Sequence, residues 1–236
     1  MAKHNVWMSV SDLMTGLMVI FLFVAIAYMI EVQKNQTVLT DYVETKNKLH
    51  DKLVKEFAGD TAQWQMQVGK DLSMKFNNPE VLFASGSYEI TPAFKKILNE
   101  FIPRYLNILL NDSLSDRIQE IRIEGHTDNV PAPDFGTDPF MSNVKLSQLR
   151  SYSVLEYIKN MPAYEKFSQK QRAMLEFWFT SNGLSYGKAL DKNGEYAAIS
   201  GKAIDKDKSR RVEFRIVTTG DEVLETFVKE NDKLTP

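Results

Sequence analysis

Hydrophobic residues in this 236-residue chain gather first in one run near the amino terminus. Residues 13–30 are apolar except for Thr15 and Gly16, and extending the run back to Val6 gives 25 residues. A helix of that length measures about 37 Å, enough to cross a hydrocarbon core of about 30 Å. The pattern therefore predicts a transmembrane helix over residues 6–30, preceded by a short segment, residues 1–5.

A cleaved signal peptide is the competing interpretation of this run, and it fits poorly. The run is longer than the apolar region of a signal peptide, and no small-residue cleavage pattern follows it. Glu31, Gln33 and Lys34 follow instead. Lys3 precedes the run, so the positive-inside rule places the amino terminus in the cytoplasm and the rest of the chain outside.

The carboxylate of Asp12 stands close to the start of the run, and two interpretations of it are open. As the N-cap of a helix beginning at Leu13, it would leave 18 apolar positions, about 27 Å, which barely spans the bilayer. As a residue nearly two turns inside a helix beginning near Val6, it would lie within the membrane. Carboxylates there are costly and typically serve a function.

Helical spacing places Asp12 on one stripe with Thr15, Gly16 and Val19, whereas bulky side chains fill the rest of the helix. Stripes of small residues let membrane helices approach one another closely. One span cannot enclose a carboxylate alone. The pattern therefore indicates a partner membrane protein that covers Asp12.

Residues 31–78 are mainly polar and carry a weak apolar seam at spacings of three and four. The seam runs through Leu39, Val43, Lys46, His50, Leu53 and Phe57. Two interpretations are open: a helical neck that pairs with a second copy of the chain, and an amphipathic helix lying against the next domain. Gly59 is expected to end this helix, and more helix is predicted over residues 61–78.

Residues 79–220 alternate between strand and helix patterns and predict one α+β domain, followed by a tail, residues 221–236. A helix is expected to open at Thr91 and Pro92, with threonine as the cap and proline in the first turn. Helices on one face of a mixed sheet, in the order β-α-β-α-β-β, are predicted. The strands are expected at 81–83, 118–124, 173–180 and 211–218, the second helix at 146–158, and a loop at 129–141.

Composition excludes several classes of function. The net charge of −2 gives no basic surface for nucleic acid. The chain has no cysteine, which excludes thiolate metal sites, and its three histidines lie far apart in the sequence. Carboxylates are available at Glu120, Glu124, Asp128 and Asp134, but no nucleophile or metal spacing accompanies them. We therefore expect neither an enzyme nor a cofactor.

Four motifs resemble the OmpA-like peptidoglycan-binding domain. They are Val81-Leu82-Phe83 with Ser85-Gly86-Ser87, Gly125-His126-Thr127-Asp128, Ser142-Asn143 with Leu146-Ser147 and Arg150, and Ser209-Arg210-Arg211-Val212-Glu213, where the family has asparagine at the first position. The membrane segment from Ser11 to Met18 resembles the segment around the ion-carrying aspartate of MotB-type stator subunits. The resemblance covers residues 5–30 and about 79–219.

This resemblance implies a B-type stator subunit of the bacterial inner membrane, with a cytoplasmic amino terminus and a periplasmic domain. It would carry protons or sodium ions through Asp12, beside Thr15 and Gly16, and two copies would stand inside a ring of five multi-span motor-A-type subunits. The short linker before Val81 is more similar to the ZorB subunits of Zorya anti-phage defence systems than to flagellar MotB. A flagellar stator and a passive membrane-to-wall tether are the alternatives.

The resemblance also implies peptidoglycan-binding residues, namely Thr127, Asp128, Asn143, Leu146, Arg150 and Arg210. Stem peptides carry a diamino acid, whose ammonium needs an acceptor and whose carboxylate needs a donor fork. Asp128 would supply the acceptor and Arg150 the fork, with Asn143 as a further anion donor. The competing interpretation is an ordinary ion pair between Asp128 and Arg150. Gly125 is expected to serve backbone geometry, and His126 to pack at the strand end.

Overall fold

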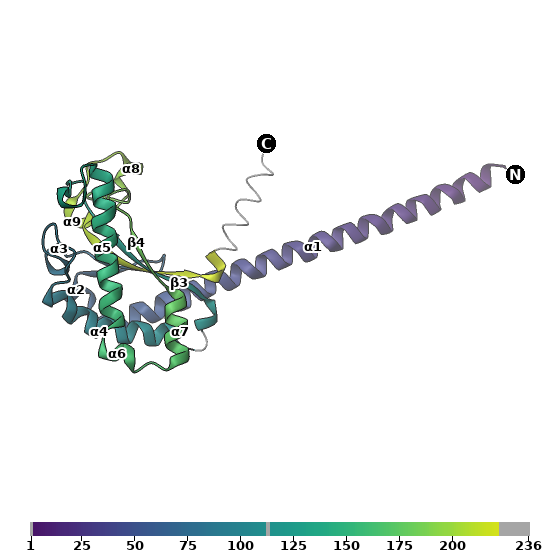
Figure 1. The fold of residues 1–236 in the computed structure, drawn as a ribbon. Coiled ribbons are helices and arrows are strands. Elements are labelled where there is room, and N and C mark those ends of the chain that lie inside the picture. Colours follow the sequence, from purple (N-terminus) through teal and green to yellow (C-terminus); the bar gives the residue numbers. More distant parts are fainter. Residues whose placement is uncertain (1, 112–113, 222–236) are drawn as a thin grey trace. The chain divides into compact units, whose positions relative to one another are not determined.

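The chain divides into two compact units, Met1–Glu44 and Thr45–Pro236. The structure, a computed structural model, describes residues 2–111 and 114–221 (Figure 1). Helix α1, Ala2–Phe57, forms the first unit and continues into the start of the second. The expected tail, residues 221–236, lies outside the described residues except for Asp221.

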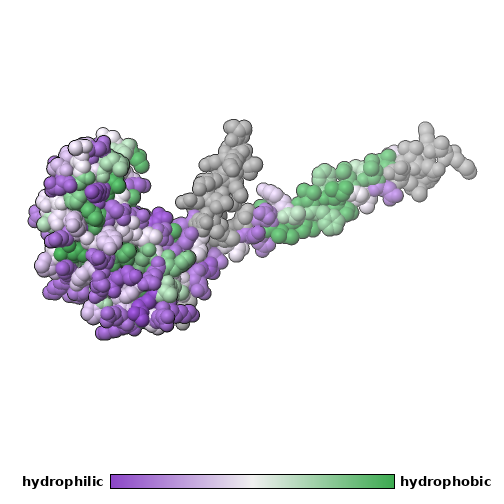
Figure 2. All heavy atoms as spheres, viewed as in Figure 1, coloured by the Kyte–Doolittle hydropathy of each residue, from purple (hydrophilic) through white to green (hydrophobic). Residues whose placement is uncertain are grey.

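The first unit contains the predicted membrane span. Within the described residues, Val10–Lys34 is the one stretch long and apolar enough to cross a membrane, with a mean hydropathy of 2.5. Figure 2 shows the apolar surface along this part of α1. Because α1 begins at Ala2, Asp12 lies inside the helix and is not its cap. The hydroxyl of Thr15 donates to the Ser11 carbonyl at 2.8 Å, so this group is satisfied within the helix.

The last turns of α1 belong to the core of the second unit. Leu49, Leu53 and Phe57 are fully buried there, which confirms the amphipathic interpretation for this part of the seam. Arg104 holds the helix end through an ion pair of 2.7 Å with Glu56 and a stacking contact of 4.7 Å with the Phe57 ring. The folded domain therefore begins near residue 45 instead of at the expected residue 79.

Residues 61–78 are not the helix that the sequence predicted. Only α2, Thr61–Trp64, is helical. Strands β1, Met66–Val68, and β2, Ser73–Phe76, follow and pair antiparallel. The apolar residues Trp64, Met66 and Val68 recur every second position, which is the period of a strand, and this period decides the structure here.

Two of the predicted strands are mostly helical. Residues 81 and 82 lie in α3, Pro79–Leu82, because the Asn78 side chain caps this helix by accepting from the Val81 amide. Residues 173–178 lie in α7, Gln169–Trp178, which opens with a capping box made by Ser168 and Gln171. Strand β4, Phe179–Gly183, begins only after α7 ends.

The remaining main elements follow the sequence patterns. Helix α4, Pro92–Leu109, opens at the predicted cap Thr91, and strands β3, Ile118–His126, and β5, Arg211–Thr218, are confirmed. Helix α5, Pro139–Lys159, is longer than predicted because Asp138 caps it. The short elements are η1 (Ser115–Arg117), η2 (Pro133–Phe135), α6 (Pro162–Glu165), α8 (Ala197–Ser200) and α9 (Lys206–Ser209).

The sheet has the strand order β1-β2-β5-β3-β4. Strands β3 and β4 run parallel, and the other neighbours pair antiparallel. The domain is thus an α+β fold with a mixed sheet, as predicted, preceded by one apolar helix. Its chain order differs from the expected β-α-β-α-β-β because β1 and β2 both precede α4.

One face of the sheet is apolar and carries the core. Ile121, Ile123 and Phe214 are fully or almost fully buried there, together with apolar residues of α1, α4, α5 and α7. The Phe101 ring of α4 lies 5.2 Å from both the Phe76 and the Phe214 rings. Burying one such large side chain stabilises the fold by about 1.5–3 kcal/mol, so this face holds the unit together.

The opposite face of the same strands is ionic although it is largely buried. Arg211 pairs with Glu213 at 2.6 Å, and Arg215 pairs with Glu213 at 2.9 Å and with Glu124 at 3.3 Å. His126 is 2 % exposed and lies beside both carboxylates, with its Nε2 3.6 Å from each. That distance is too long for a hydrogen bond, and in the part of the chain that the structure describes neither ring nitrogen has a hydrogen-bond partner.

Helix α5 lies unusually close to the sheet at two paired glycines. Gly125 of β3 and Gly183 of β4 are register partners. A Cβ on Gly125 would lie 2.2 Å from the Ser147 carbonyl oxygen, and one on Gly183 would lie 2.4 Å from the Gln148 amide nitrogen. Neither contact is possible for a real side chain, so glycine is required by this close approach and not by a left-handed backbone.

We predict that Gly125→Ala or Gly183→Ala destabilises the unit, because the new methyl group would push α5 off the sheet. Overpacking of this kind typically costs about 1–3 kcal/mol. Urea denaturation of a fragment that begins at Thr45 would measure it. Gly59→Ala is the matched control, since nothing lies within 4 Å of its Cβ position. Equal stability of all three variants would contradict the packing argument.

A second prediction concerns the pH dependence of stability. Burial lowers the pKa of His126, and the charge of Arg211 lowers it further against the opposing effect of Glu124. The folded state thus keeps this ring neutral at a pH where the unfolded chain, with a pKa of about 6.5, binds a proton. Stability should therefore fall as the pH drops below about 6.5, by at most about 1.4 kcal/mol per pH unit.

Urea denaturation at pH 7.5 and 5.5 would measure this loss, and His126→Gln should reduce it. Asp71 does not interfere, because its pKa, about 2, lies far below this range. A His126→Gln variant that loses as much stability as the unchanged protein would contradict the prediction.

Candidate functional site

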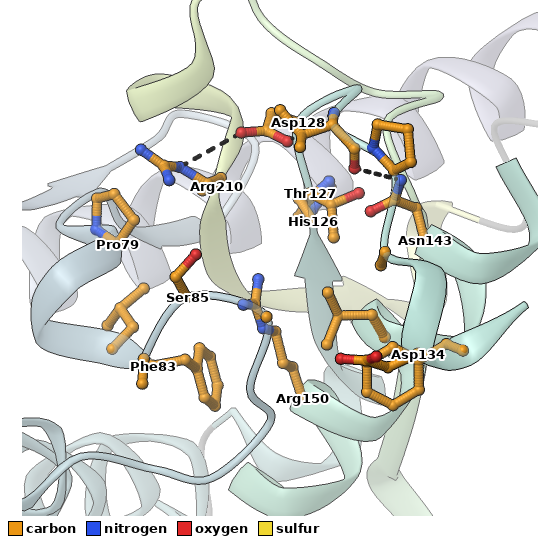
Figure 3. A pocket seen from close by; sticks show the side chains of 18 of the residues that line it. Pro79, Phe83, Ser85, His126, Thr127, Asp128, Asp134, Asn143, Arg150 and Arg210 are labelled. Atoms are coloured by element: carbon orange, nitrogen blue, oxygen red, sulfur yellow. Dashed lines mark hydrogen bonds and ion pairs between the residues drawn. The ribbon is translucent and has the colours of Figure 1, made fainter. Parts of the chain in front are cut away.

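A cavity of about 370 Å³ opens beside the carboxyl end of β3. One wall is formed by residues 79–86, and the facing wall by residues 126–135. Helix α5 and the start of β5 complete it (Figure 3). Polar and charged side chains from segments far apart in the sequence therefore meet in one place.

All six residues that the sequence singled out for peptidoglycan binding line this cavity. They are Thr127, Asp128, Asn143, Leu146, Arg150 and Arg210. The first two follow directly after β3, the next three lie at successive turns of α5, and Arg210 precedes β5. The close approach of α5 at Gly125 is what brings the helix residues to the end of β3.

Asp128 is oriented by the backbone and contacts one arginine. Its Oδ1 accepts from the Val130 amide at 2.9 Å, and its Oδ2 lies 3.5 Å from the Arg210 Nε. Within the described residues its ion-pair contact is with Arg210, and no pair with Arg150 occurs. The competing interpretation of an Asp128–Arg150 pair is therefore wrong. Arg210 also pairs with Asp207 at 2.6 Å.

Arg150 reaches the cavity from α5 and is 8 % exposed. Its Nε donates to the Ser87 carbonyl at 2.9 Å, and its guanidinium lies 5.0 Å from the centre of the Phe83 ring. Burial lowers the pKa of Arg150 to about 10, the charge of Arg210 adds to this, and Asp128 opposes it. Arg150 is still a cation at neutral pH, so its guanidinium and that of Arg210 line the same cavity as the carboxylate of Asp128.

Asn143 and Thr127 have roles that the sequence did not indicate. The Asn143 Nδ2 donates to the carbonyls of Val130 and Pro139, both at 2.9 Å. Both of its hydrogens are used, so Asn143 fixes the loop above the cavity and is not the anion donor that was expected. The Thr127 amide donates to the Ser185 carbonyl, while its buried hydroxyl has no hydrogen-bond partner within residues 2–111 and 114–221.

Glu124, His126 and Glu213 are the one group of described residues whose ligand atoms lie close enough together to hold a metal ion. Arg211 and Arg215 already pair with the two carboxylates. Their positive charges oppose a cation, so we interpret the group as a buried ion network. The network lies directly beneath the cavity, because His126 and Arg211 are register partners at the ends of β3 and β5.

Sequence reasoning missed the contribution of residues 83–87 to the site. Phe83 and Ser87 belong to the motif that carried the resemblance, but Phe83 was predicted to lie in a strand and Ser87 had no predicted role. Their contacts with Arg150 cross more than sixty positions of sequence, so no local pattern could predict them. The family motif over residues 81–87 was the one signal in the sequence that could have indicated this contribution to the site.

The residues predicted for the ion path lie in the first unit. Asp12, Thr15 and Gly16 are exposed on α1 in the single chain. Among the described residues, no other side chain lies within 4 Å of a Cβ built on Gly16. This stripe is therefore open to a neighbouring helix, as the pattern of small residues indicated.

Comparison with known proteins gives one close relative and a set of weaker structural likenesses. The periplasmic domains of MotB include one with a TM-score of 0.39, at 18% identity over 70% of this chain and 72% of that one. A Helicobacter pylori MotB domain has a TM-score of 0.38, at 18% identity over 70% of this chain and 87% of that one. No family model matches the chain.

A curated relative is the Zorya protein ZorB of Escherichia coli. It is 36% identical to this chain, over 95% of this chain and 92% of that protein. The alignment thus includes both the apolar helix and the domain that carries the cavity. Identity at this level over nearly the whole length of both proteins shows that the chain belongs to the ZorB family.

Proposed function

We propose that this chain is the ion-conducting, peptidoglycan-anchored B-type stator subunit of a Zorya-type anti-phage defence machine. It spans the bacterial inner membrane once through α1, with its amino terminus in the cytoplasm and the unit from Thr45 in the periplasm. Membership of the ZorB family supports the defence role over a flagellar one. The observation that carries the anchoring function is the cavity in which Asp128 faces Arg150 and Arg210.

The ion-carrying group is Asp12. It lies in the candidate span Val10–Lys34, on a helix whose apolar side chains are exposed in the single chain. Helices of a multi-span motor-A-type partner cover this surface and enclose the carboxylate. Two copies of this chain stand inside a ring of five such partners. Thr15 and Gly16 leave room for close helix contact beside the ion path.

Ion flow changes the charge of Asp12 and thereby the packing of the partner helices. When a proton or sodium ion neutralises the buried carboxylate, the cost of keeping a charge in a low dielectric disappears. The partner helices can then shift between two arrangements. The membrane potential supplies about 2.3 kcal/mol per charge for each 100 mV. The transported ion is the only small species required, without a cofactor.

The wall-binding step uses groups of opposite charge that lie at different places in the cavity. Asp128 accepts hydrogen bonds from the ammonium of the diamino acid in a stem peptide. The terminal nitrogens of Arg150 donate to the carboxylate of the same diamino acid, and Arg210 adds positive charge beside them. The Thr127 hydroxyl lies beside this group, buried and without a hydrogen-bond partner among the described residues. The cavity therefore binds a zwitterionic group through directed, opposite charges.

Both ends are needed in one chain because a rotary motor needs a fixed reference. The ion path at Asp12 drives movement of the partner ring, and the cavity holds this subunit to the cell wall. A passive membrane-to-wall tether would use the cavity alone. The two functions differ in whether Asp12 must titrate.

We predict that Asp12→Asn abolishes ion conduction and phage defence while leaving assembly with the partner intact. Asparagine keeps the shape of the side chain but cannot bind and release a proton. Asp12→Glu should retain part of the activity, because the charge remains and only its reach changes. Ion flux into vesicles holding the assembled complex would measure this. Asp51→Asn, on the exposed surface of the same helix, is the control. Full conduction by Asp12→Asn would contradict the ion-carrying role and would favour the passive membrane-to-wall tether.

A further prediction is that Asp128→Ala and Arg150→Ala weaken binding to purified peptidoglycan. Each loses charge-assisted hydrogen bonds of about 1.5–3 kcal/mol, or about tenfold or more in affinity. Co-sedimentation with sacculi would measure this on a fragment that begins at Thr45, since Leu49, Leu53 and Phe57 are part of the core.

Arg172→Ala, on the exposed side of α7, is the control for a general loss of positive charge. Circular dichroism would verify the fold of each variant. If both cavity variants sedimented as well as the unchanged fragment, the cavity would not be the wall-binding site.

A further inference from the structure

Arg150 is held on two sides by one short segment, residues 83–87. The Ser87 carbonyl accepts from its Nε at 2.9 Å, and the Phe83 ring lies 5.0 Å from its guanidinium carbon. Together with the burial of Arg150, these contacts fix the end of a long side chain that would otherwise be free to change rotamer.

These two contacts leave a particular edge of the guanidinium for a ligand. Because Nε donates to Ser87, the two terminal nitrogens remain, and Figure 3 shows the Arg150 side chain pointing into the cavity. A pair of terminal nitrogens in one plane matches the two oxygens of a carboxylate. The contact with Phe83 sets the position of that plane, since arginine stacks on aromatic faces.

The segment that holds Arg150 is itself fixed. Phe83 is 5 % exposed, and its ring packs against Phe94 of the core at 6.1 Å. The Ser87 amide donates to the Ala84 carbonyl, which closes a turn. Tyr88 contacts Phe135 on the facing wall, with ring centres 6.3 Å apart. The segment is thus anchored to the core and to the opposite side of the cavity.

We propose that Phe83 is a positioning residue for carboxylate recognition, acting through Arg150. Its ring holds the guanidinium so that the two terminal nitrogens meet the ligand carboxylate together. The inference rests on the proposed wall-binding function and adds a residue whose effect depends on the ligand carboxylate. Phe83 does not touch the ligand carboxylate in this arrangement. Removing its ring should therefore matter only when both Arg150 and that carboxylate are present.

The test uses two soluble peptides and the full-length chain in detergent. One peptide is a stem tripeptide ending in a diamino acid with a free carboxylate, and the other carries a carboxamide in its place. Phe83→Leu should weaken binding of the first peptide about fivefold, the size expected for loss of a partly buried cation–π contact. It should leave binding of the carboxamide peptide unchanged, and Phe83→Tyr should bind both peptides as the unchanged chain does.

A double-mutant cycle separates positioning from a general structural effect. In an Arg150→Ala background, Phe83→Leu should cause no further loss of affinity, because the group it positions is absent. Phe76→Leu is the matched control, since Phe76 is a buried core ring that does not line the cavity. It should lower the thermal stability without changing the affinity of the folded protein. Phe83→Met, which keeps most of the volume, replaces the leucine variant if that one does not fold.

The outcomes distinguish this inference from the function on which it rests. An equal loss for both peptides, or a loss that persists in the Arg150→Ala background, overturns the positioning role alone. A full-length chain that binds neither peptide overturns the wall-binding function and this inference with it. A loss confined to the carboxylate peptide and to chains that retain Arg150 supports both.

Discussion

The contact between α5 and the paired glycines of β3 and β4 is the constraint on which the cavity depends. Gly125 and Gly183 allow the helix backbone to lie where any Cβ would collide with it. Asn143, Leu146 and Arg150 reach the cavity because α5 is this close to the strand end that carries Asp128. A helix displaced even by the width of a methyl group would move the arginine away from the carboxylate. Packing and ligand recognition are thus set by the same contact.

The sheet supports this arrangement with two unlike faces. Its apolar face is covered by helices that include the last turns of α1, so the segment following the membrane span is part of the folded domain. Its ionic face places Arg211 against Glu213 beneath the cavity. Arg211 also donates to the carbonyls of Ser209 and Lys188, which ties the backbone just before Arg210 to the loop at Lys188. The buried charges therefore position the cavity residues and at the same time make the domain sensitive to acid through His126.

The charge of Arg150 is kept apart from that of Asp128 instead of being neutralised by it. Asp128 faces Arg210 at 3.5 Å, while Arg150 is held away by Ser87 and Phe83. A direct Asp128–Arg150 pair would have satisfied both groups and left little for a ligand. With the charges separated, a zwitterionic group can bind both at once. At the other end of the chain, Asp12 is likewise without an enclosing partner in the single chain. Both proposed functional groups thus depend on molecules outside this chain.

The sequence by itself determined the features that rest on local signals. The apolar run, the cap at Thr91, the alternation of β3 and β5, and the motif residues around the cavity all depend on neighbours within a few positions. Only the tertiary structure decided that β1 and β2 join the sheet and that Leu49 to Phe57 enter the core. It also assigned Asn143 to the loop and Phe83 to Arg150. The physical reason is that these outcomes depend on partners brought together by folding, which no spacing along the chain records.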